Sequence, residues 1–158
     1  MNKIQYTLLF VCLSIAFSGY AQDYGYKYGI MTIDGKIITP AIYDGVDGRA
    51  LNLGEYHLVV EKNGRKGIIG TDGKQVGEIK YDYVSVFARP MYEVRLDGKC
   101  GFVNKHGQEA IPCVYDSYVT TDDISEWYCM RKGDKYGMVD NLNNVIIPFE
   151  YEDINYYE

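Results

Sequence analysis

Histidine and tryptophan are scarce in this sequence, and so are the residue patterns that catalytic and metal sites require. Its 158 residues include two histidines, one tryptophan and four cysteines. His57 lies in a segment whose length varies along the chain, and His106 lies at a predicted turn. Neither is accompanied by a nucleophile elbow, paired metal-ligand spacing or a phosphate-binding loop. The sequence therefore predicts two solvated loop histidines, no catalytic residue and no cofactor.

Positive charge is also in short supply. Sixteen lysines and arginines are outweighed by 22 acidic residues, which gives a net charge of −6, and the basic residues are scattered. Proteins that bind nucleic acids rely on clustered lysine and arginine to neutralise phosphates. Nucleic acid is therefore not an expected partner.

Long apolar segments are missing except near the N-terminus. Residues 6–17 are apolar but shorter than the roughly 20 residues that span a bilayer. Lys3 precedes this stretch and Gly19-Tyr20-Ala21 follows it, which is the layout of a cleaved secretory signal peptide. We therefore expect residues 1–21 to be removed and the mature chain, 22–158, to lie in the periplasm, on the cell surface or outside the cell, without membrane insertion.

The chain is rich in an internal repeat. Four times a glycine, here called the anchor glycine, is followed fourteen residues later by a tyrosine, here called the repeat tyrosine. The anchor glycines are 38, 34 and 36 residues apart, so the interval inside a unit is fixed while the connections vary. The pairs are Gly29 and Tyr43, Gly67 and Tyr81, Gly101 and Tyr115, and Gly137 and Tyr151. We predict one domain of four units, at 24–46, 58–84, 92–119 and 127–154.

Two turn signals recur at fixed distances from each anchor glycine. Asn-Gly, Asp-Gly or Gly-Asp pairs precede it at 63–64, 97–98 and 133–134. Pairs that end in glycine or asparagine follow it at 34–35, 72–73, 106–107 and 142–143. Asn-Gly and Asp-Gly accept the positive φ values of a two-residue type I′ turn, and Asn143 tolerates the same left-handed conformation. We therefore predict two hairpins in each full unit.

Each full unit is thus a predicted three-stranded antiparallel meander. The predicted strands are 58–62, 65–70 and 74–79, then 91–96, 99–104 and 108–113, then 127–132, 135–139 and 145–149. The first unit, 26–33 and 36–42, lacks a leading strand. The predicted fold class is all-β, an open array of stacked meanders, because too few strands and too few residues after Tyr151 remain to close it. A small propeller-like closure is the alternative.

Pairing the strands through these turns separates each unit into two faces. One face is apolar and in the second unit holds Leu58, Val60 and Ile69 with the anchor glycine. A side chain at the glycine would collide with its packing neighbours. The opposite face, which includes Ile68, is expected to be half-buried where one unit leans against the next.

Three cysteines follow the predicted signal peptide: Cys100, Cys113 and Cys129. If His106-Gly107 is a two-residue turn, Cys100 lies opposite Cys113, and these two can form a disulfide in an oxidising compartment. Pro112 cannot donate a ladder hydrogen bond, so the pairing can also end one residue earlier and leave three reduced thiols. Both alternatives stay open at this stage.

The third copy contains Lys99-Cys100-Gly101, a turn at His106-Gly107, Ile111-Pro112 and Tyr115-Asp116. This order resembles the bacterial WG, or KWG, repeat, in which Lys-Trp-Gly is followed by a turn with glycine, an apolar pair, proline and Tyr-Asp. The other copies keep the frame, and the tryptophan position holds Tyr28, Lys66, Cys100 or Tyr136. The resemblance implies an exported interaction module without catalytic residues to transfer.

An acidic residue follows each repeat tyrosine: Asp44, Asp82, Asp116 and Glu152. An aspartate at a turn commonly accepts a hydrogen bond from a backbone N–H. The alternative is a ladder of carboxylates that binds a cation such as Ca²⁺. The favoured interpretation is the cap, so no metal ligand is assigned.

Seventeen tyrosines make this residue the strongest composition signal. The four repeat tyrosines are predicted packing residues, because half-buried sheets favour aromatics. Other aromatics lie at the termini or near the variable connections, where rigid amphipathic rings suit binding of a protein or a glycan. The predicted binding residues are Tyr56, Tyr118, Trp127, Tyr156 and Tyr157. The sequence thus favours a non-enzymatic interaction module over a glycan hydrolase that uses the Tyr-Asp carboxylates or a calcium-stabilised structural adaptor.

Overall fold

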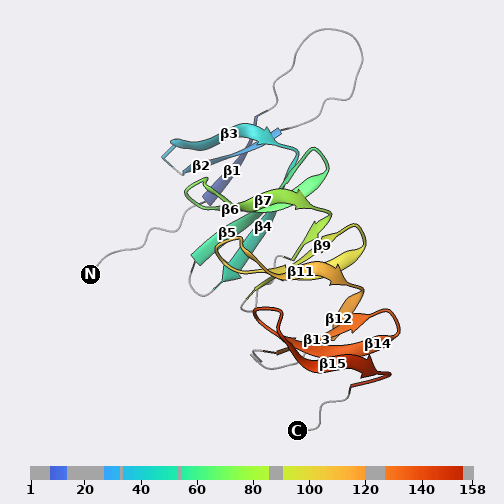
Figure 1. Ribbon diagram of the computed structural model, residues 1–158. Helices are drawn as coiled ribbons and strands as arrows, with labels where there is room; N and C mark the ends of the chain where they lie inside the picture. The colour runs from blue at the N-terminus through green and yellow to red at the C-terminus, as the bar shows by residue number, and fades with distance from the viewer. Residues whose placement is uncertain are drawn as a thin grey trace, which may run out of the picture.

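The computed structural model describes residues 8–13, 27–32, 34–52, 55–85, 91–119 and 127–154 (Figure 1). Every regular secondary-structure element in these ranges is a strand. The described residues contain no helix that is long and apolar enough to cross a membrane. The strands are β1 (Leu8–Leu13), β2 (Lys27–Thr32), β3 (Ile37–Tyr43), β4 (Gly45–Asn52), β5 (Glu55–Lys62), β6 (Arg65–Gly70), β7 (Gln75–Tyr81), β8 (Tyr83–Val84), β9 (Tyr92–Leu96), β10 (Lys99–Val103), β11 (Glu109–Tyr115), β12 (Ser117–Val119), β13 (Trp127–Lys132), β14 (Lys135–Asp140) and β15 (Val145–Tyr151).

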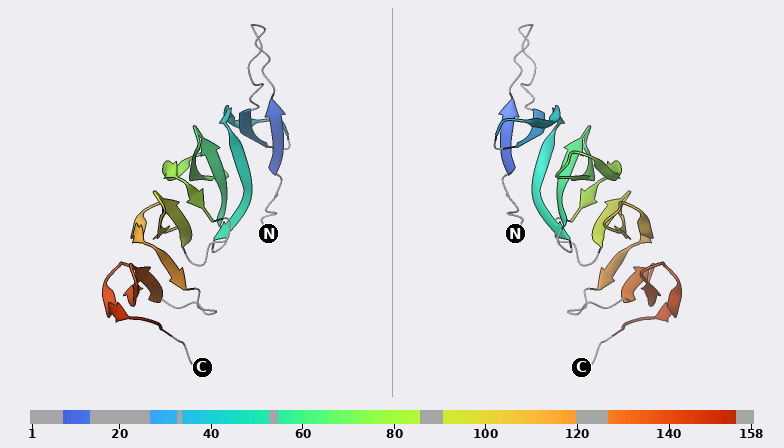
Figure 2. Two further views of the ribbon diagram at one scale, coloured as in Figure 1. Left: turned by 90° about the vertical axis from the view of Figure 1, so that its right-hand side faces the viewer. Right: turned by 90° about the vertical axis from the view of Figure 1, so that its left-hand side faces the viewer.

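The strands form four antiparallel sheets, β1-β2-β3, β4-β5-β6-β7, β8-β9-β10-β11 and β12-β13-β14-β15. The sheets follow one another along an open arc, with β1–β3 at one end and β12–β15 at the other (Figures 1 and 2). The predicted all-β array is therefore confirmed. The propeller-like alternative is wrong for the described residues, whose two ends lie far apart.

Each inner sheet contains one more strand than the predicted meander. β4, β8 and β12 directly follow the Tyr-Asp pair of one unit but pair with the leading strand of the next unit, as in Val46 with Val60 and Val84 with Val94. Two of these strands have only two or three residues, too few to show an alternating pattern in the sequence. Every sheet after the first is thus built from two consecutive units.

The first unit also differs from the prediction, which gave it no leading strand. β1 pairs antiparallel with β2, with Leu9 opposite Met31 and Val11 opposite Gly29. In the second unit Leu58 lies opposite Ile69 and Val60 opposite Gly67, so Leu9 and Val11 hold the positions of Leu58 and Val60. β1 lies within the predicted signal peptide, whose removal stays a prediction.

A bulge in the third strand explains the anchor glycines. Cys100 pairs with Tyr115 and Phe102 with Ile111, so residues 112–114 stand opposite Gly101 alone. A Cβ atom on Gly101 would lie 2.5 Å from the carbonyl oxygen of Ile111. For Gly29 and Gly137 the nearest atom is also a carbonyl oxygen, at 2.7 and 2.8 Å, whereas a Cβ on Gly67 would lie 2.7 Å from the Ile79 Cγ1 and 2.8 Å from the Ile79 Cα. Backbone, more than the neighbouring side chains of the apolar face, therefore excludes a side chain there.

The two kinds of turn have different geometries. Asn63-Gly64 and Asp97-Gly98 have positive φ at both residues, as predicted for type I′ turns. The second turns have three residues, because in the first unit Thr32 N–H donates to the Lys36 carbonyl and Gly35 N–H to the Thr32 carbonyl. In the second, third and fourth units only the last residue of this turn has positive φ, and in the fourth unit that residue is Asn143 at 64°. Gly35, the last residue of the turn in the first unit, also has positive φ. The prediction of two-residue second turns is therefore wrong.

The longer turn also overturns the predicted register of the cysteines. Cys100 pairs with Tyr115, and Cys113 lies within the bulge. Cys100, Cys113 and Cys129 are not joined in disulfides, and the Cys113 thiol donates to the Val94 carbonyl at 3.8 Å. Burial raises the pKa of Cys113 to about 11, so this thiol stays protonated near neutral pH and reacts slowly. The Cys100–Cys113 disulfide is not formed in this structure.

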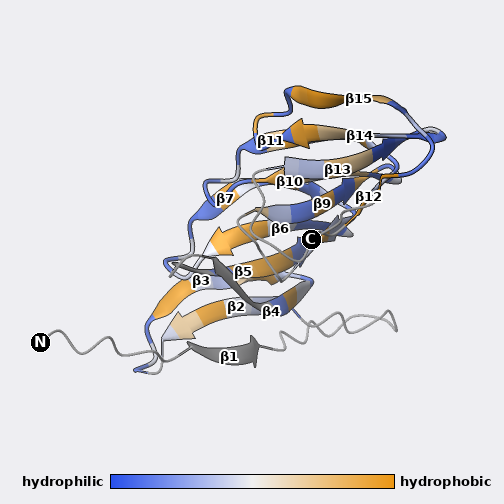
Figure 3. Cartoon of the chain, turned by 90° about the horizontal axis from the view of Figure 1, so that it is seen from below, coloured by the Kyte–Doolittle hydropathy of each residue, from blue (hydrophilic) through white to orange (hydrophobic). Residues whose placement is uncertain are grey.

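The hydrophobic core lies between the units. Tyr43 of the first unit packs in one cluster with Leu58, Val60 and Ile69 of the second. Tyr81 and Tyr115 make the same link to the third and fourth units, and these three tyrosines are only 4 to 5% exposed. The apolar residues lie mostly in the strands, while the turns are hydrophilic (Figure 3). Each unit therefore completes its core against its neighbours. The predicted packing role is confirmed for these three tyrosines, whereas the fourth repeat tyrosine, Tyr151, is 44% exposed.

Candidate interaction surface

The aspartate after each inner repeat tyrosine caps a turn of the next unit. Asp44 accepts a hydrogen bond from the Asn63 N–H at 2.6 Å, and Asp82 accepts one from the Asp97 N–H at 2.7 Å. Asp116 accepts one from the Gly133 N–H at 2.7 Å. The predicted backbone cap is thus confirmed, and it joins consecutive units.

A basic residue near the start of the same unit pairs with each capping aspartate. The ion pairs are Lys27 with Asp44, Arg65 with Asp82, and Lys99 with Asp116. Lys99, together with the Gly133 N–H, holds the pKa of Asp116 below its usual value, and Lys27 does the same for Asp44. Glu152, the fourth acidic residue, lies 3.5 Å from Lys135.

The cation-ladder alternative requires several carboxylates around one point. Within the described residues no three or more histidine, cysteine, aspartate or glutamate side chains come together in that way. Asp44, Asp82 and Asp116 lie in successive units, and a cation and a backbone N–H already contact each of them. The ion pairs and turn caps account for these carboxylates without a metal.

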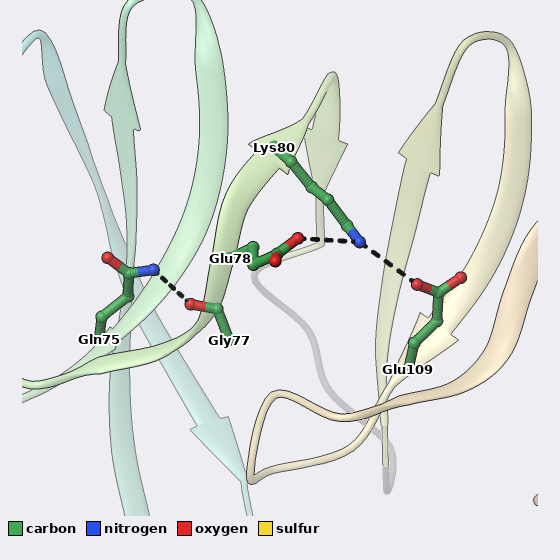
Figure 4. Close-up of polar contacts among 5 residues, drawn as sticks. All are labelled: Gln75, Gly77, Glu78, Lys80 and Glu109. Carbon is green, nitrogen blue, oxygen red and sulfur yellow. Dashed lines mark hydrogen bonds and ion pairs between the residues drawn. The ribbon is translucent and has the colours of Figure 1, made fainter.

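Lys80 adds a further link between the second and third units. Its amine lies 3.1 Å from Glu78 in its own unit and 3.4 Å from Glu109 in the next (Figure 4). In the same view the Gln75 side-chain amide donates to the Gly77 carbonyl at 2.6 Å. Gly77 stands where the other three bulges have threonine or isoleucine before proline, and its φ is +79°.

Two predicted binding aromatics occupy contrasting environments. The ring of Tyr118 packs edge-on against Phe102, with ring centroids 5.1 Å apart, and its hydroxyl donates to Glu93 at 2.9 Å. Trp127, the first residue of β13, is 51% exposed. Tyr118 therefore supports the packing of the third unit, whereas about half of the surface of Trp127 remains exposed.

The remaining predicted binding residues are less completely placed. Tyr56 lies near the start of β5, but its side chain is outside the part that the structure describes. Tyr156 and Tyr157 lie outside the described residues altogether. β4, β8 and β12 run toward one side of the arc, and β5, β9 and β13 begin there (Figure 2). Tyr56 and Trp127 thus come from equivalent ends of two units.

Sequence reasoning missed a buried polar pair near the same strand ends. His57, predicted to be a solvated loop residue, is 6% exposed on β5, and its Nδ1 lies 2.6 Å from the Tyr92 hydroxyl. His57 pairs with Gly70, and Leu58 beside it with Ile69. The only signal in the sequence was its position one residue before the alternating pattern of Leu58 and Val60.

An open hollow of about 190 Å³ lies over β4, β5 and β6. Asp47 and Lys66 line it and form an ion pair at 3.5 Å. Pockets for small molecules usually enclose about 300–1,000 Å³ and surround most of the ligand. This hollow is therefore smaller than a typical small-molecule pocket.

A sequence profile described as the WG containing repeat matches residues 67–100, 101–136 and 136–158, more than half of the chain. The chain belongs to the WG repeat family. No curated protein matches it. The profile does not include residues 27–43, but these share the bulge and the three-residue turn of the other WG units.

The first and last residues of the WG motif contact each other in the structure. The basic residue that opens Lys-Trp-Gly and the aspartate that closes Tyr-Asp form one ion pair across 17 residues. The tryptophan position pairs across strands with the repeat tyrosine, as in Tyr28 with Tyr43 and Cys100 with Tyr115. Lys66 and Tyr136 hold the same position in the other two WG units.

Proposed function

We propose that this WG repeat protein is an exported, non-enzymatic interaction module that binds a protein or a glycan. The proposed binding surface is the side of the arc toward which β4, β8 and β12 run and at which β5, β9 and β13 begin. The exposure of Trp127 carries the proposal, because the inner repeat tyrosines and the capping aspartates serve the packing of the array. Exposed tryptophan is among the residues that contribute most to binding energy at interfaces.

The use of the carboxylates supports a binding module over the glycan-hydrolase alternative. A glycosidase needs two carboxyl groups that face each other across one sugar, about 5–10 Å apart. Asp44, Asp82 and Asp116 belong to three successive units, and each caps a turn in the following unit. A residue in such a cap serves the fold and is not free to exchange protons with a substrate.

Export rests on the signal-like layout of residues 1–21, and the N-terminus of the protein recovered from its producing cell tests it. We expect the mature chain to begin at Gln22 and to be recovered outside the cytoplasm. Recovery of the whole chain, with Met1 to Ala21 intact, inside the cell would contradict this part of the proposal.

Binding is tested by capturing partners on the immobilised mature chain and by screening the same chain on a glycan array. We expect Trp127→Ala to weaken the captured interaction at least tenfold, equivalent to about 1.4 kcal/mol. Val114→Ala is the matched control, because Val114 is 44% exposed but lies in the bulge of β11. Equal retention of partners by both variants would place binding elsewhere.

A further inference from the structure

The last WG unit exposes apolar side chains that its predecessors do not. Tyr151 is 44% exposed, against 4 to 5% for the three inner repeat tyrosines. Ile146 is 45% exposed, and β15 forms a hydrophobic strand at the end of the array (Figure 3). Terminal units of repeat proteins usually carry a polar outer face that keeps them soluble. This end of the array has the apolar face of an inner unit.

Some positions are exposed in every unit, whereas others are exposed only in the last unit. Val145 is exposed, but so are the residues at its position in the other units, Ile37, Gln75 and Glu109. Ile146 instead corresponds to Ile38, Val76 and Ala110, all of which pack against core clusters. Tyr151 and Ile146 are therefore exposed because the described residues contain no fifth unit that would cover them.

The first unit shows the opposite deficiency. Ile69, Val103 and Val139, two residues after their anchor glycines, are at most 1% exposed and lie in clusters with the repeat tyrosine of the preceding unit. Met31 holds this position in the first unit and is half-buried. Among the described residues the first sheet has three strands, with no counterpart of the outer strand that the preceding unit supplies as β4, β8 or β12.

The chain also carries, after its last unit, the start of a segment equivalent to that outer strand. Ile154 stands seventeen residues after its anchor glycine, as do Val46, Val84 and Tyr118. Those three residues pair with Val60, Val94 and Met130 of the next leading strand. The corresponding register position in the first sheet is Val11 on β1, opposite Gly29.

We propose that the C-terminal WG unit of one copy docks head to tail on the N-terminal unit of a second copy and repeats the internal interface. Tyr151 and Ile146 cover the face that includes Met31, which lies after Gln22 and is therefore kept when residues 1–21 are removed. In a chain that retains β1, Ile154 lies opposite Val11 as Val46 lies opposite Val60. Such a heterologous contact leaves both outer ends open, so it extends into a filament or closes into a ring.

A concentration series of the full chain, analysed by sedimentation velocity, tests the proposal. We expect concentration-dependent association that Ile146→Asp weakens at least tenfold and that Val145→Asp, its matched control, leaves unchanged. A full chain that stays monomeric at several hundred micromolar would overturn the proposal and indicate that another partner covers this end. An equal effect of both variants would overturn it too.

Mixing two blocked variants distinguishes head-to-tail docking from contact between two C-terminal ends. Met31→Asp and Ile146→Asp should each be folded by circular dichroism and monomeric alone, and together they should form a 1:1 complex through the intact face that each retains. Self-association of Met31→Asp would indicate contact between C-terminal ends, and the absence of a complex in the mixture would equally overturn the proposal. The chain beginning at Gln22 keeps Met31, Ile146 and Tyr151, so it should also associate with increasing concentration. A chain beginning at Gln22 that stays monomeric would contradict the proposal.

Discussion

At the scale of single residues, the anchor glycine allows the third strand of each unit to cross close to the second. A Cβ on Gly101 would lie within 2.5 to 2.8 Å of three backbone atoms in residues 111–113. Backbone cannot rotate away as the end of a flexible side chain can. The glycine is therefore a requirement of the bulge, and its position fixes where the bulge occurs.

We predict that Gly101→Val lowers the free energy of unfolding by about 3 kcal/mol or more, as overpacking against fixed backbone does. Gly45→Val is the matched control, since a Cβ at Gly45 would meet only the Glu61 side chain, at 3.6 Å or more. It should change stability by no more than about 0.5 kcal/mol. Urea denaturation of both variants measures this, and equal losses would show that the bulge does not constrain Gly101.

The capping aspartates give a prediction about acid. The pKa of Asp116 is lowered by Lys99 and the Gly133 N–H, so its contribution to stability is present above the ordinary value of 3.8 and is lost as the pH falls below it. Asp116→Asn should therefore flatten the dependence of the melting midpoint on pH between about 5 and 3. Asp116→Ala, which also removes the acceptor for Gly133, should melt below Asp116→Asn at neutral pH.

Calcium provides the control for this interpretation. The cap needs no ion, so calcium should leave the melting midpoint of the unmodified protein where it is in the presence of a chelator. A rise in the midpoint with calcium that Asp82→Asn and Asp116→Asn abolish would replace the cap with the cation ladder.

At the scale of the elements, local turn chemistry was predictable and register was not. Asn63-Gly64 and Asp97-Gly98 specify their type I′ turns through two residues with positive φ. The second turns also end in glycine or asparagine, but their third residue shifts the pairing, and the bulge shifts it again. Cys100 and Cys113 were misplaced for this reason. β8 was missed because two residues carry no periodicity.

The candidate site was predictable to a similar extent. Trp127 stands out in the sequence as the only tryptophan, and the structure leaves it exposed at the start of β13. Tyr118 looks the same in the sequence, yet its contacts with Phe102 and Glu93 arise from residues 16 and 25 positions away. Such contacts depend on how the sheets stack, which the sequence pattern does not specify.

The second unit forms its bulge without proline, and this difference gives a prediction at the scale of elements. A Cβ on Gly77 would lie 2.7 Å from the Gly107 carbonyl oxygen, in the turn of the next unit, and Gly77 has a φ of +79°. Gly64 has a similar φ of +72°, but a Cβ there would meet no atom within 4 Å. Gly77→Ala and Gly64→Ala therefore share the left-handed strain but differ in the contact between units.

We expect Gly64→Ala to cost about 1 kcal/mol, the usual cost of a left-handed alanine. Gly77→Ala should cost at least about 1 kcal/mol more, because the turn around Gly107 must also move. Equal costs in urea denaturation would mean that the turn of the third unit does not rest on the second.

At the scale of the whole molecule, the core lies between units, so stability is a property of the array. The clusters around Tyr43, Tyr81 and Tyr115 each combine residues of two consecutive units. The capping aspartates and the outer strands β4, β8 and β12 cross the same boundaries. A WG unit thus depends on its neighbours for its apolar core, one of its turn caps and one strand of its sheet.

Deletion of residues 127–158 tests this claim most directly. The deletion removes β13–β15, which cover Tyr115 and Phe102, residues that are 4 and 5% exposed in the complete array. The account predicts that the shortened chain melts at a lower temperature, binds a hydrophobic dye and aggregates or partly unfolds. A shortened chain that stays monomeric with the melting curve of the complete protein would show that the units are independent and would contradict a core built between them.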